Sequence, residues 1–287
     1  MRLLRIGAAG AERPALLDPD GTTLRDLTGL VDDIDGELLA DPFALDRIRA
    51  AAGAGVLPVL DAPAGVRPGP PVARIGKVVC IGLNYHDHAA EIGAEPPAEP
   101  VVFLKAADTV VGANDTVLVP RGSTKTDWEV ELAVVIGRTA RYLGDDEDPL
   151  AYVAGYAVAH DVSERAFQLE RGGTWDKGKN CETFNPLGPW LVTSDEVPDP
   201  QALGLRLWVN GELRQNGSTA DQIFPVAEVV RYVSRFMTLY PGDIINTGTP
   251  AGVAIGQGDA ARYLRAGDVV EAEADGLGRQ RQTLKDA

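Results

Sequence analysis

Two acidic side chains lie in a segment that is otherwise apolar. Residues 124–137 are TKTDWEVELAVVIG, in which one valine separates Glu129 from Glu131. Strand periodicity points both side chains to the same side, with their Cα atoms about 6.5–7 Å apart. Two buried anions at that spacing repel each other unless a cation or another partner compensates them. A half-exposed strand with a polar face is the alternative, although LAVVIG is apolar on both faces.

A third carboxylate, Asp161, follows another apolar run in the segment GYAVAHDVSERAFQ at residues 155–168. An aspartate at the end of a strand often only caps the next helix, and the residues alone leave that interpretation open. Together with Glu129 and Glu131, Asp161 would supply three oxygen ligands and leave positions for water and substrate. Carboxylates without thiols or imidazole favour a hard cation, so the pattern predicts a site for Mg²⁺, Mn²⁺ or Ca²⁺.

A candidate general base lies in the segment GLNYHDHAAEIG at residues 82–93. His88 and Glu91 are three residues apart, so they share one face if a helical turn begins near Asp87. A histidine held by a glutamate can take a proton from water near neutral pH. A surface His–Glu pair without function is the alternative, and His86 and Asp87 are expected to be turn or capping residues.

Two further segments contain polar groups suited to an anionic substrate. In RGGTWDKGKNCETF at residues 171–184, a glycine-containing loop precedes Lys177 and Lys179, and either lysine could stabilise an enolate or simply lie on the surface. In NTGTPAGVAIGQG at residues 246–258, Thr249 could bind a substrate carboxylate or belong to a plain turn. This segment lacks the Gly-Lys-Ser/Thr ending of a phosphate-binding loop, so nucleotide binding is not supported.

Composition limits the classes of function. The 287 residues include 42 acidic and 27 basic side chains, a net charge of −15, which argues against nucleic acid as a partner. No apolar run approaches the roughly 20 residues of a membrane span, and no signal peptide is recognisable, so we expect a cytoplasmic protein that does not bind membranes. Two cysteines and three histidines form neither a disulfide framework nor a zinc cluster.

The elements expected around these residues form a small N-terminal αβ domain at 1–70 and a larger β-rich domain at 71–287. A Pro- and Gly-rich extended crossing at 60–76 separates them. An Asn-Gly pair at 210–211 predicts a hairpin. The pattern at 224–239 predicts a helix that buries Val226, Val229, Val230, Val233, Phe236 and Met237. Strands do not alternate with long helices, so we expect an α+β fold with a mixed, mostly antiparallel sheet, closed or sandwiched. The main strands are expected at 77–84, 101–106, 116–120, 128–137, 152–162, 190–193, 205–211, 243–248 and 268–274.

In combination, these segments resemble the fumarylacetoacetate hydrolase family over about residues 73–280. The resemblance is carried by GLNYHDHAAE, FLK, DWEVELAVVIG, GYAVAHDVSERAFQ, GKNCETFNPLGP and GDIINTGTPAGV, in that order. It implies a mixed β-roll, a homodimer and a bound Mg²⁺ or Mn²⁺. By matching motif it assigns the metal to Glu129, Glu131 and Asp161, water activation to His88 and Glu91, and the active-site lysine to Lys179. The remaining positions that it implies, as substrate contacts, are Gln168, Thr249, Arg165 and Lys105.

Within the family, SERAFQLERGGTWDKGK and YVSRFMTLYPGDI most resemble bacterial 2,4-diketo-3-deoxy-sugar-acid hydrolases, whose members are often labelled ureidoglycolate lyase. The resemblance therefore implies hydrolysis of a carbon–carbon bond in a 2,4-diketo acid, either an acylpyruvate or a 2,4-diketo-3-deoxy sugar acid, with release of pyruvate. The alternatives are decarboxylation of oxaloacetate, isomerisation of a 2-hydroxyhepta-2,4-diene-1,7-dioate, ureidoglycolate lyase activity, and a non-catalytic cation-binding protein. His160, Asn180 and Asn185 depart from the usual family residues.

Overall fold

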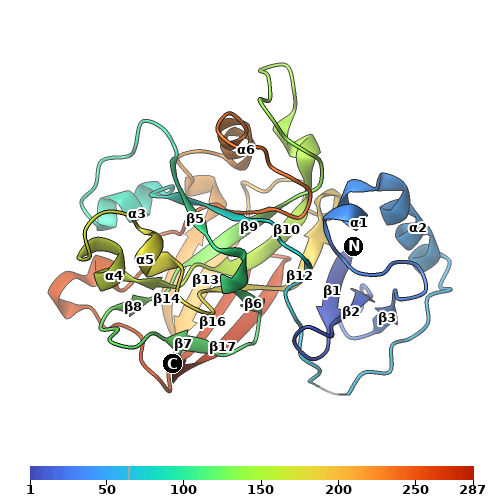
Figure 1. Ribbon diagram of the computed structural model, residues 1–287, viewed down its shortest axis with the longest axis horizontal. Helices are drawn as coiled ribbons and strands as arrows, with labels where there is room; N and C mark the ends of the chain where they lie inside the picture. The colour runs from blue at the N-terminus through green and yellow to red at the C-terminus, as the bar shows by residue number, and fades with distance from the viewer. Residues whose placement is uncertain (64) are drawn as a thin grey trace.

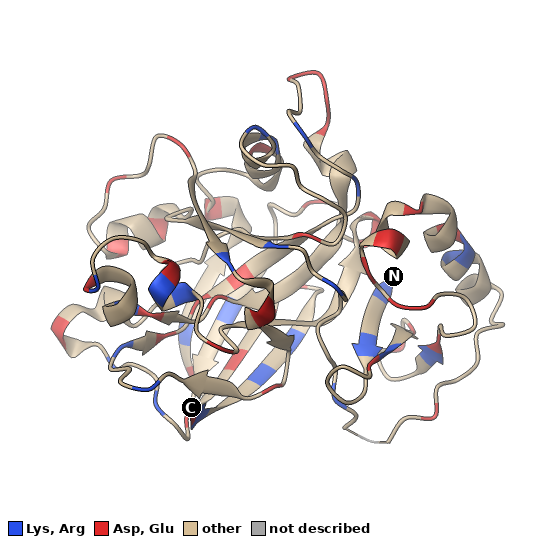
Figure 2. Cartoon of the chain, viewed as in Figure 1, with Lys and Arg blue, Asp and Glu red and all other residues tan. Residues whose placement is uncertain are grey.

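The computed structural model describes residues 1–63 and 65–287. Residue 64, within the expected extended crossing, lies outside the described residues. Strands form most of the regular structure, and a smaller N-terminal part lies beside the larger C-terminal part in Figure 1. Acidic side chains are spread over both parts (Figure 2), so the net negative charge is not confined to one tail. In the described chain no helix is both long and apolar enough to span a membrane.

The largest sheet contains ten strands. In chain order they are β1 (Arg2–Ile6), β2 (Arg13–Leu17), β3 (Leu24–Asp26), β4 (Val78–Gly82), β5 (Val101–Lys105), β6 (Val110–Gly112), β9 (Val130–Ile136), β10 (Val153–His160), β12 (Asn185–Thr193) and β15 (Ile244–Asn246). Across the sheet the order is β3-β2-β1-β12-β10-β9-β15-β4-β5, with β6 beside β12. The β15–β4 and β6–β12 pairs are parallel and the other pairs are antiparallel, so the predicted mixed sheet is confirmed.

The first three strands belong to the same sheet as the C-terminal part. β1 pairs with β12, with Arg2 opposite Val192 and Leu3 opposite Leu191. Two helices, α1 (Gly36–Ala40) and α2 (Pro42–Gly53), pack beside these strands, and Asp35 and Asp41 cap them. The pairing of β1 with β12 joins the two parts of the chain in one sheet, so the sheet itself does not mark a domain boundary. The boundary expected near residue 70 stays a prediction.

A second sheet faces the first. Its strands in spatial order are β14 (Glu212–Ser218), β13 (Gly204–Val209), β16 (Val269–Ala274), β17 (Gly278–Asp286) and β7 (Val117–Val119). Leu132 and Val134 of β9 share one buried cluster with Leu205 and Leu207 of β13, so the core lies between the two sheets. Both sheets end in edge strands within the described residues; the sandwiched arrangement is therefore confirmed, and the closed arrangement is wrong.

The hairpin predicted at Asn210–Gly211 is confirmed. β13 and β14 run antiparallel on either side of it, and both turn residues have positive φ, 52° and 81°. Asparagine and glycine tolerate that conformation better than other residues, which is why this pair favours a tight hairpin turn.

The long predicted helix is shorter than its pattern. α6 (Val226–Ser234) buries its four valines, as predicted, but it ends before Phe236, whose side chain is 65% exposed. The prediction that Phe236 is buried is therefore wrong, because the repeat of the valines does not continue once the helix stops at Ser234. Residues 235–239, which were expected to form the last turn of the helix, instead lie in the connection from α6 to β15.

Short elements surround one end of the large sheet (Figure 1). The helices among them are α3 (His86–Glu91), α4 (Arg165–Leu169) and α5 (Asp176–Lys179). The two-residue strands β8 (Thr126–Asp127) and β11 (Ser163–Glu164) form a third sheet. The 3₁₀ segments of the chain are η1 (Ala107–Thr109), η2 (Pro149–Tyr152), η3 (Ser194–Glu196), η4 (Thr219–Asp221) and η5 (Ile255–Ala260), the last of which is kinked at Gly258.

Candidate active site

Three carboxylates meet at the end of the large sheet. Glu131 belongs to β9, Glu129 directly precedes this strand, and Asp161 directly follows β10. Because β9 and β10 are antiparallel neighbours, with Glu131 opposite Ala159, residues far apart in sequence come together here. One oxygen from each carboxylate lies within 4.8 Å of the others, and all three side chains are buried. This is the donor set of a hard divalent cation.

Lys179 lies between two of these carboxylates. Its Nζ donates to Glu129 Oε2 at 2.7 Å and to Asp161 Oδ2 at 2.9 Å, and it lies 5.0 Å from the ring centroid of Phe103. Burial opposes the lysine charge, but the two carboxylates raise the pKa of Lys179 above its ordinary value. Lys177 instead is exposed and donates to the carbonyl of Arg171, so it lies outside this cluster.

Lys105, from β5, approaches Asp161 from another side. Its Nζ pairs with Asp161 Oδ1 and donates to the carbonyls of Val162 and Phe184 at 3.2 and 2.6 Å. The side chain is almost completely buried, with a relative exposure of 1%. With three oxygen acceptors around one ammonium group, Lys105 holds Asp161 in place, and its side chain does not line the cavity beside the carboxylates.

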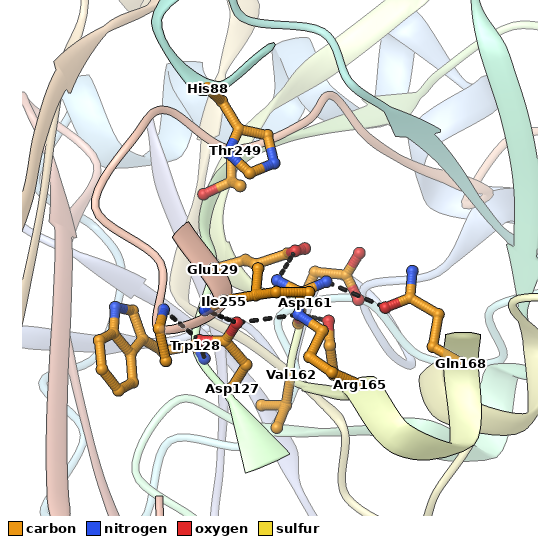
Figure 3. A network of polar contacts seen from close by, with 12 residues as sticks. His88, Asp127, Trp128, Glu129, Asp161, Val162, Arg165, Gln168, Thr249 and Ile255 are labelled. Carbon is orange, nitrogen blue, oxygen red and sulfur yellow. Dashed lines mark hydrogen bonds and ion pairs between the residues drawn. The ribbon is translucent and has the colours of Figure 1, made fainter. Parts of the chain in front are cut away.

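Arg165, at the start of α4, donates one hydrogen bond inside the protein from each of its three guanidinium nitrogens. Nε donates to Asp127 Oδ2 at 2.8 Å, Nη2 donates to Glu129 Oε1 at 2.6 Å, and Nη1 donates to Gln168 Oε1 at 3.0 Å (Figure 3). Burial would raise the pKa of Glu129, but Lys179 and Arg165 outweigh it and lower this pKa to about 2. Glu129 is therefore ionised and held from two sides.

Glu131 is in a different electrostatic position. Its Oε2 accepts a hydrogen bond from the backbone N–H of Gly248 at 2.8 Å, but no lysine or arginine in the described chain forms an ion pair with it. Burial, together with the charges of Asp161 and Glu129, raises the pKa of Glu131 well above its ordinary value. A divalent cation among the three carboxylates would remove this conflict. The residues present therefore fit a metal ion.

His88 and Glu91 lie on α3 and face each other as their spacing predicted. The distance from His88 Nδ1 to Glu91 Oε2 is 3.3 Å, and Glu91 Oε1 accepts from the backbone N–H of Gly252 at 2.9 Å. A carboxylate only accepts hydrogen bonds, so the proton of neutral His88 lies on Nδ1 and the lone pair lies on Nε2. Glu91 thereby orients a histidine that can act as a base.

A cavity of about 120 Å³ joins these groups. His88 and Thr249 lie on one side of the space shown in Figure 3, and Glu129, Asp161 and Gln168 lie on the other. The hydroxyl of Thr249 donates to the carbonyl of Val130 at 2.8 Å and accepts from the Gln215 amide at the same distance. The apolar side chains of the wall are Ile81, Leu83, Ile92, Phe103, Leu169, Trp175 and Ile255.

The three positions that depart from the family pattern lie close to this cluster but not in its cavity. His160 is fully buried, and its Nδ1 lies 3.1 Å from Gln282 Oε1. Asn180 Nδ2 donates to the carbonyls of Leu104 and Asp176, and Asn185 Oδ1 accepts from Asn246 Nδ2 at 2.8 Å. Each side chain therefore has a structural partner, although His160 Nε2 and Asn185 Nδ2 are buried without one among the described residues.

Sequence reasoning missed Asp127. This buried carboxylate accepts hydrogen bonds from Arg165 Nε and from the backbone N–H groups of Ala254 and Ile255. The signal was present, because Asp127, Glu129 and Glu131 follow the same two-residue period. Asp127 connects the loop after β15 to the arginine that holds Glu129.

The family model described as "Fumarylacetoacetate (FAA) hydrolase C-terminal" matches residues 77–285. A protein of Burkholderia ambifaria named "Putative hydrolase" is 52% identical over 287 residues, which is the full length of both chains. The chain therefore belongs to the fumarylacetoacetate hydrolase family.

Two solved structures show the same fold. The first, from Mycobacterium abscessus, is described as a "probable 2-hydroxyhepta-2,4-diene-1,7-dioate isomerase"; it is 36% identical, has a TM-score of 0.81, and the match covers 100% of this chain and 99% of that one. The second is maleylpyruvate hydrolase from Sphingobium sp. SYK-6 in complex with manganese (II) ion and pyruvate, 30% identical with a TM-score of 0.80 and full coverage of both chains. The predicted α+β family fold is confirmed.

Proposed function

We propose that this protein is a metal-dependent hydrolase that cleaves a carbon–carbon bond in a 2,4-diketo acid and releases pyruvate. The observation that carries the proposal is the joining, in one cavity, of three carboxylates suited to a divalent cation with a His88–Glu91 pair suited to take a proton from water. The relative that is a hydrolase in complex with manganese and pyruvate supports this choice of reaction.

Glu129, Glu131 and Asp161 would hold Mg²⁺ or Mn²⁺. The charged side chains of the buried cluster are Asp127, Glu129, Glu131, Asp161, Lys105, Arg165 and Lys179. Four acids thus face three bases, and with a divalent cation in place the cluster would carry one positive charge, which the carboxylate of a 2-oxo acid would balance. When bound, the metal would supply a Lewis acid that polarises the substrate oxygens.

His88 would act on water. With its Nδ1 proton held by Glu91, Nε2 can remove a proton as the water oxygen bonds to C4 of the substrate. The bond between C3 and C4 then breaks, and its electron pair stays with C3 as the enolate of pyruvate. A proton delivered to C3 completes pyruvate, and the acyl half leaves as a carboxylic acid.

Lys179 would stabilise the negative charge of that enolate, because its ammonium group lines the cavity and lies beside both Glu129 and Asp161. Gln168 and Thr249 line the same cavity and would contact the substrate. Arg165 and Lys105 would position carboxylates, since every nitrogen of the two groups already donates to a protein oxygen. A homodimer remains our prediction for the assembly.

The experiment that tests the proposal measures pyruvate release from acylpyruvates, 2,4-diketo-3-deoxy sugar acids and oxaloacetate, and glyoxylate release from ureidoglycolate, with Mg²⁺, Mn²⁺ or EDTA. We expect diketo acids to release pyruvate only with metal. His88→Ala should stop hydrolysis but keep the metal-dependent thermal shift, whereas Glu129→Gln should lose both. Full turnover of Glu129→Gln in EDTA would refute the metal-dependent mechanism.

A second candidate function keeps the enolate and omits the water. The relative described as a dienedioate isomerase favours keto–enol isomerisation, and decarboxylation of oxaloacetate would use the same charge cluster. Neither reaction needs water attack, so an activity that survives His88→Ala and Glu91→Ala would favour this candidate. Ureidoglycolate lyase activity would be recognised in the substrate panel by release of glyoxylate from ureidoglycolate.

A further inference from the structure

The walls of the cavity differ sharply from its floor. Glu129, Asp161 and Lys179 form a charged floor, while the space beyond them is bordered by large apolar side chains. The large apolar side chains that line the cavity are Ile81, Leu83, Ile92, Phe103, Leu169, Trp175 and Ile255. The part of a substrate that projects away from the floor must therefore be compatible with an apolar surface.

The cations that line the cavity are already paired. Arg165 donates to Asp127, Glu129 and Gln168 through its three nitrogens, and Lys179 donates to Glu129 and Asp161. Within residues 1–63 and 65–287, no other lysine or arginine lines this cavity. A second carboxylate at the far end of a substrate would thus lose water without gaining a positive partner.

Two features show that the apolar wall is built rather than incidental. Leu83 has φ of 54°, a conformation that non-glycine residues rarely adopt, and the neighbouring Asn84 fixes it by bonds to the backbone of Phe224 and Thr247. Trp175 lies so close to Gly82 that an added Cβ would come within 2.3 Å of its ring.

The ring of Trp175 is also held by another aromatic residue. It packs edge-on against Phe103, with ring centroids 5.3 Å apart and an interplanar angle of 63°. The glycine at position 82 thus leaves the space that Trp175 fills, and both Leu83 and the indole of Trp175 line the cavity. Position 175 thus holds a bulky apolar side chain, whereas a charged or hydroxylated substrate tail would need a polar side chain there.

We propose that the group distal to the 2-oxo acid in the substrate is an uncharged, apolar acyl chain. This inference rests on the proposed function and selects, within it, acylpyruvates with alkyl tails over diketo-deoxy sugar acids and over dicarboxylates. The inferred substrate differs from the compounds named in the descriptions of two relatives, a diene-dioate and maleylpyruvate. A polyhydroxylated tail is disfavoured because an apolar wall leaves its hydroxyl groups without partners.

A binding experiment tests the inference without turnover. The ligands are 2-oxohexanoate and 2-oxoadipate, which have equal chain length and differ by a terminal methyl or carboxylate; neither has the diketo group needed for cleavage. Calorimetric titration of the full chain in Mg²⁺ should show roughly 10-fold or tighter binding of 2-oxohexanoate. Equal binding, or tighter binding of 2-oxoadipate, would overturn the inference.

A charge placed on the wall should reverse the preference. Leu169 is 54% exposed at the rim, so Leu169→Arg should fold and should bind 2-oxoadipate more tightly than 2-oxohexanoate. Leu104→Arg adds the same charge at a 42% exposed leucine outside the cavity lining and should keep the original order. Reversal by both variants, or by neither, would contradict a specific role for this wall.

Turnover separates failure of this inference from failure of the proposed function. Butanoylpyruvate and succinylpyruvate form a matched substrate pair, and we expect butanoylpyruvate to have the higher kcat/KM by roughly 10-fold or more. A preference for succinylpyruvate would overturn the inference and leave the hydrolase intact. No pyruvate from either substrate, with the binding preference retained, would reject the hydrolase and leave the apolar specificity standing.

Discussion

Lys179 Nζ and Glu129 Oε2 lie 2.7 Å apart inside the protein, where both side chains are almost completely excluded from water. The same ammonium group lies 2.9 Å from Asp161 Oδ2. One lysine therefore compensates two of the three carboxylates that we assign to the metal. Its removal should make the stability of the protein depend on a bound cation.

We expect Lys179→Met to lower the free energy of unfolding by about 3–5 kcal/mol in EDTA, because the variant leaves buried carboxylates without their partner. Added Mn²⁺ should recover more of this loss than it adds to the wild type. Urea unfolding with and without metal measures both effects. Lys177→Met is the matched control, since Lys177 is exposed and should change stability by less than about 0.5 kcal/mol. Equal losses in the two variants would contradict the assignment.

Glu129→Gln and Glu131→Gln should affect the metal-free protein in opposite directions. The pKa of Glu131 is raised by burial and by neighbouring carboxylates, so neutral glutamine should stabilise the fold at pH 7 by about 1–2 kcal/mol. The pKa of Glu129 is lowered to about 2 by Lys179 and Arg165, so its replacement should destabilise the fold by about 3 kcal/mol. Both variants should lose the stabilisation by Mg²⁺. Unfolding in EDTA measures the two signs, and a common sign would be inconsistent with these charges.

The same shift predicts a pH dependence in EDTA. A raised pKa means that folded Glu131 keeps its proton at pH values where the unfolded chain has lost it. Its contribution to stability is therefore complete below the ordinary glutamate pKa of about 4.3 and is lost as pH rises through the higher folded pKa. Denaturation curves between pH 4 and 8 should show this loss in the wild type, and Glu131→Gln should lack it. A parallel pH profile of the two proteins would speak against the shift.

Asp127 should be a positioning residue. It accepts hydrogen bonds from Arg165 and from two backbone N–H groups, and Arg165 in turn holds Glu129. Asp127→Asn should reduce metal affinity and kcat/KM by about 10–100-fold, as loss of an outer hydrogen-bond partner does at other metal sites. Metal titration by calorimetry and steady-state kinetics measure both. Glu170→Gln, which alters only an exposed pair with Lys125, should leave them unchanged.

The cysteines should take no part in the reaction. Burial raises the pKa of Cys181 to about 11 and that of Cys80 well above its ordinary value. Below that pH the thiol of Cys181 stays neutral, so at pH 8 its alkylation should be about 100-fold slower than that of a free thiol. Mass spectrometry after iodoacetamide treatment, with Cys181→Ser as the control, measures this rate. Rapid labelling at pH 7 would show that the thiol is not desolvated.

Strand periodicity was sufficient to place the carboxylates of Glu129 and Glu131 together, because the period is a local property of the chain. The pairing of His88 with Glu91 was predictable for the same reason. The partners of Arg165 and Lys105 were not predictable from spacing, because their ion pairs depend on how distant strands meet. The apolar wall formed by Leu83 and Trp175 was missed because loop conformation determines which side chains face the cavity.

Some elements also lacked a local signal. β17 was not predicted, because Gln280 and Gln282 occupy buried positions where an apolar residue would reveal the strand. The Gln280 amide donates to the carbonyls of Val158, Pro186 and Gly188, so contacts with the other sheet replace hydrophobic burial. Phe236 is the opposite case, because an apolar residue there predicted helix where none exists. It continues the apolar spacing of the four valines, although α6 ends at Ser234.

The pairing of β1 with β12 has a consequence for synthesis on the ribosome. β1 can join β2 as soon as the first strands emerge, but its other neighbour contains Leu191 and Val192, which are translated much later. Long-range pairing of this kind delays folding, because most of the polypeptide must be available before the contact can form. Although β1 is translated before β12, its sheet is therefore among the parts completed late, and until then the free edge of β1 is open to other strands.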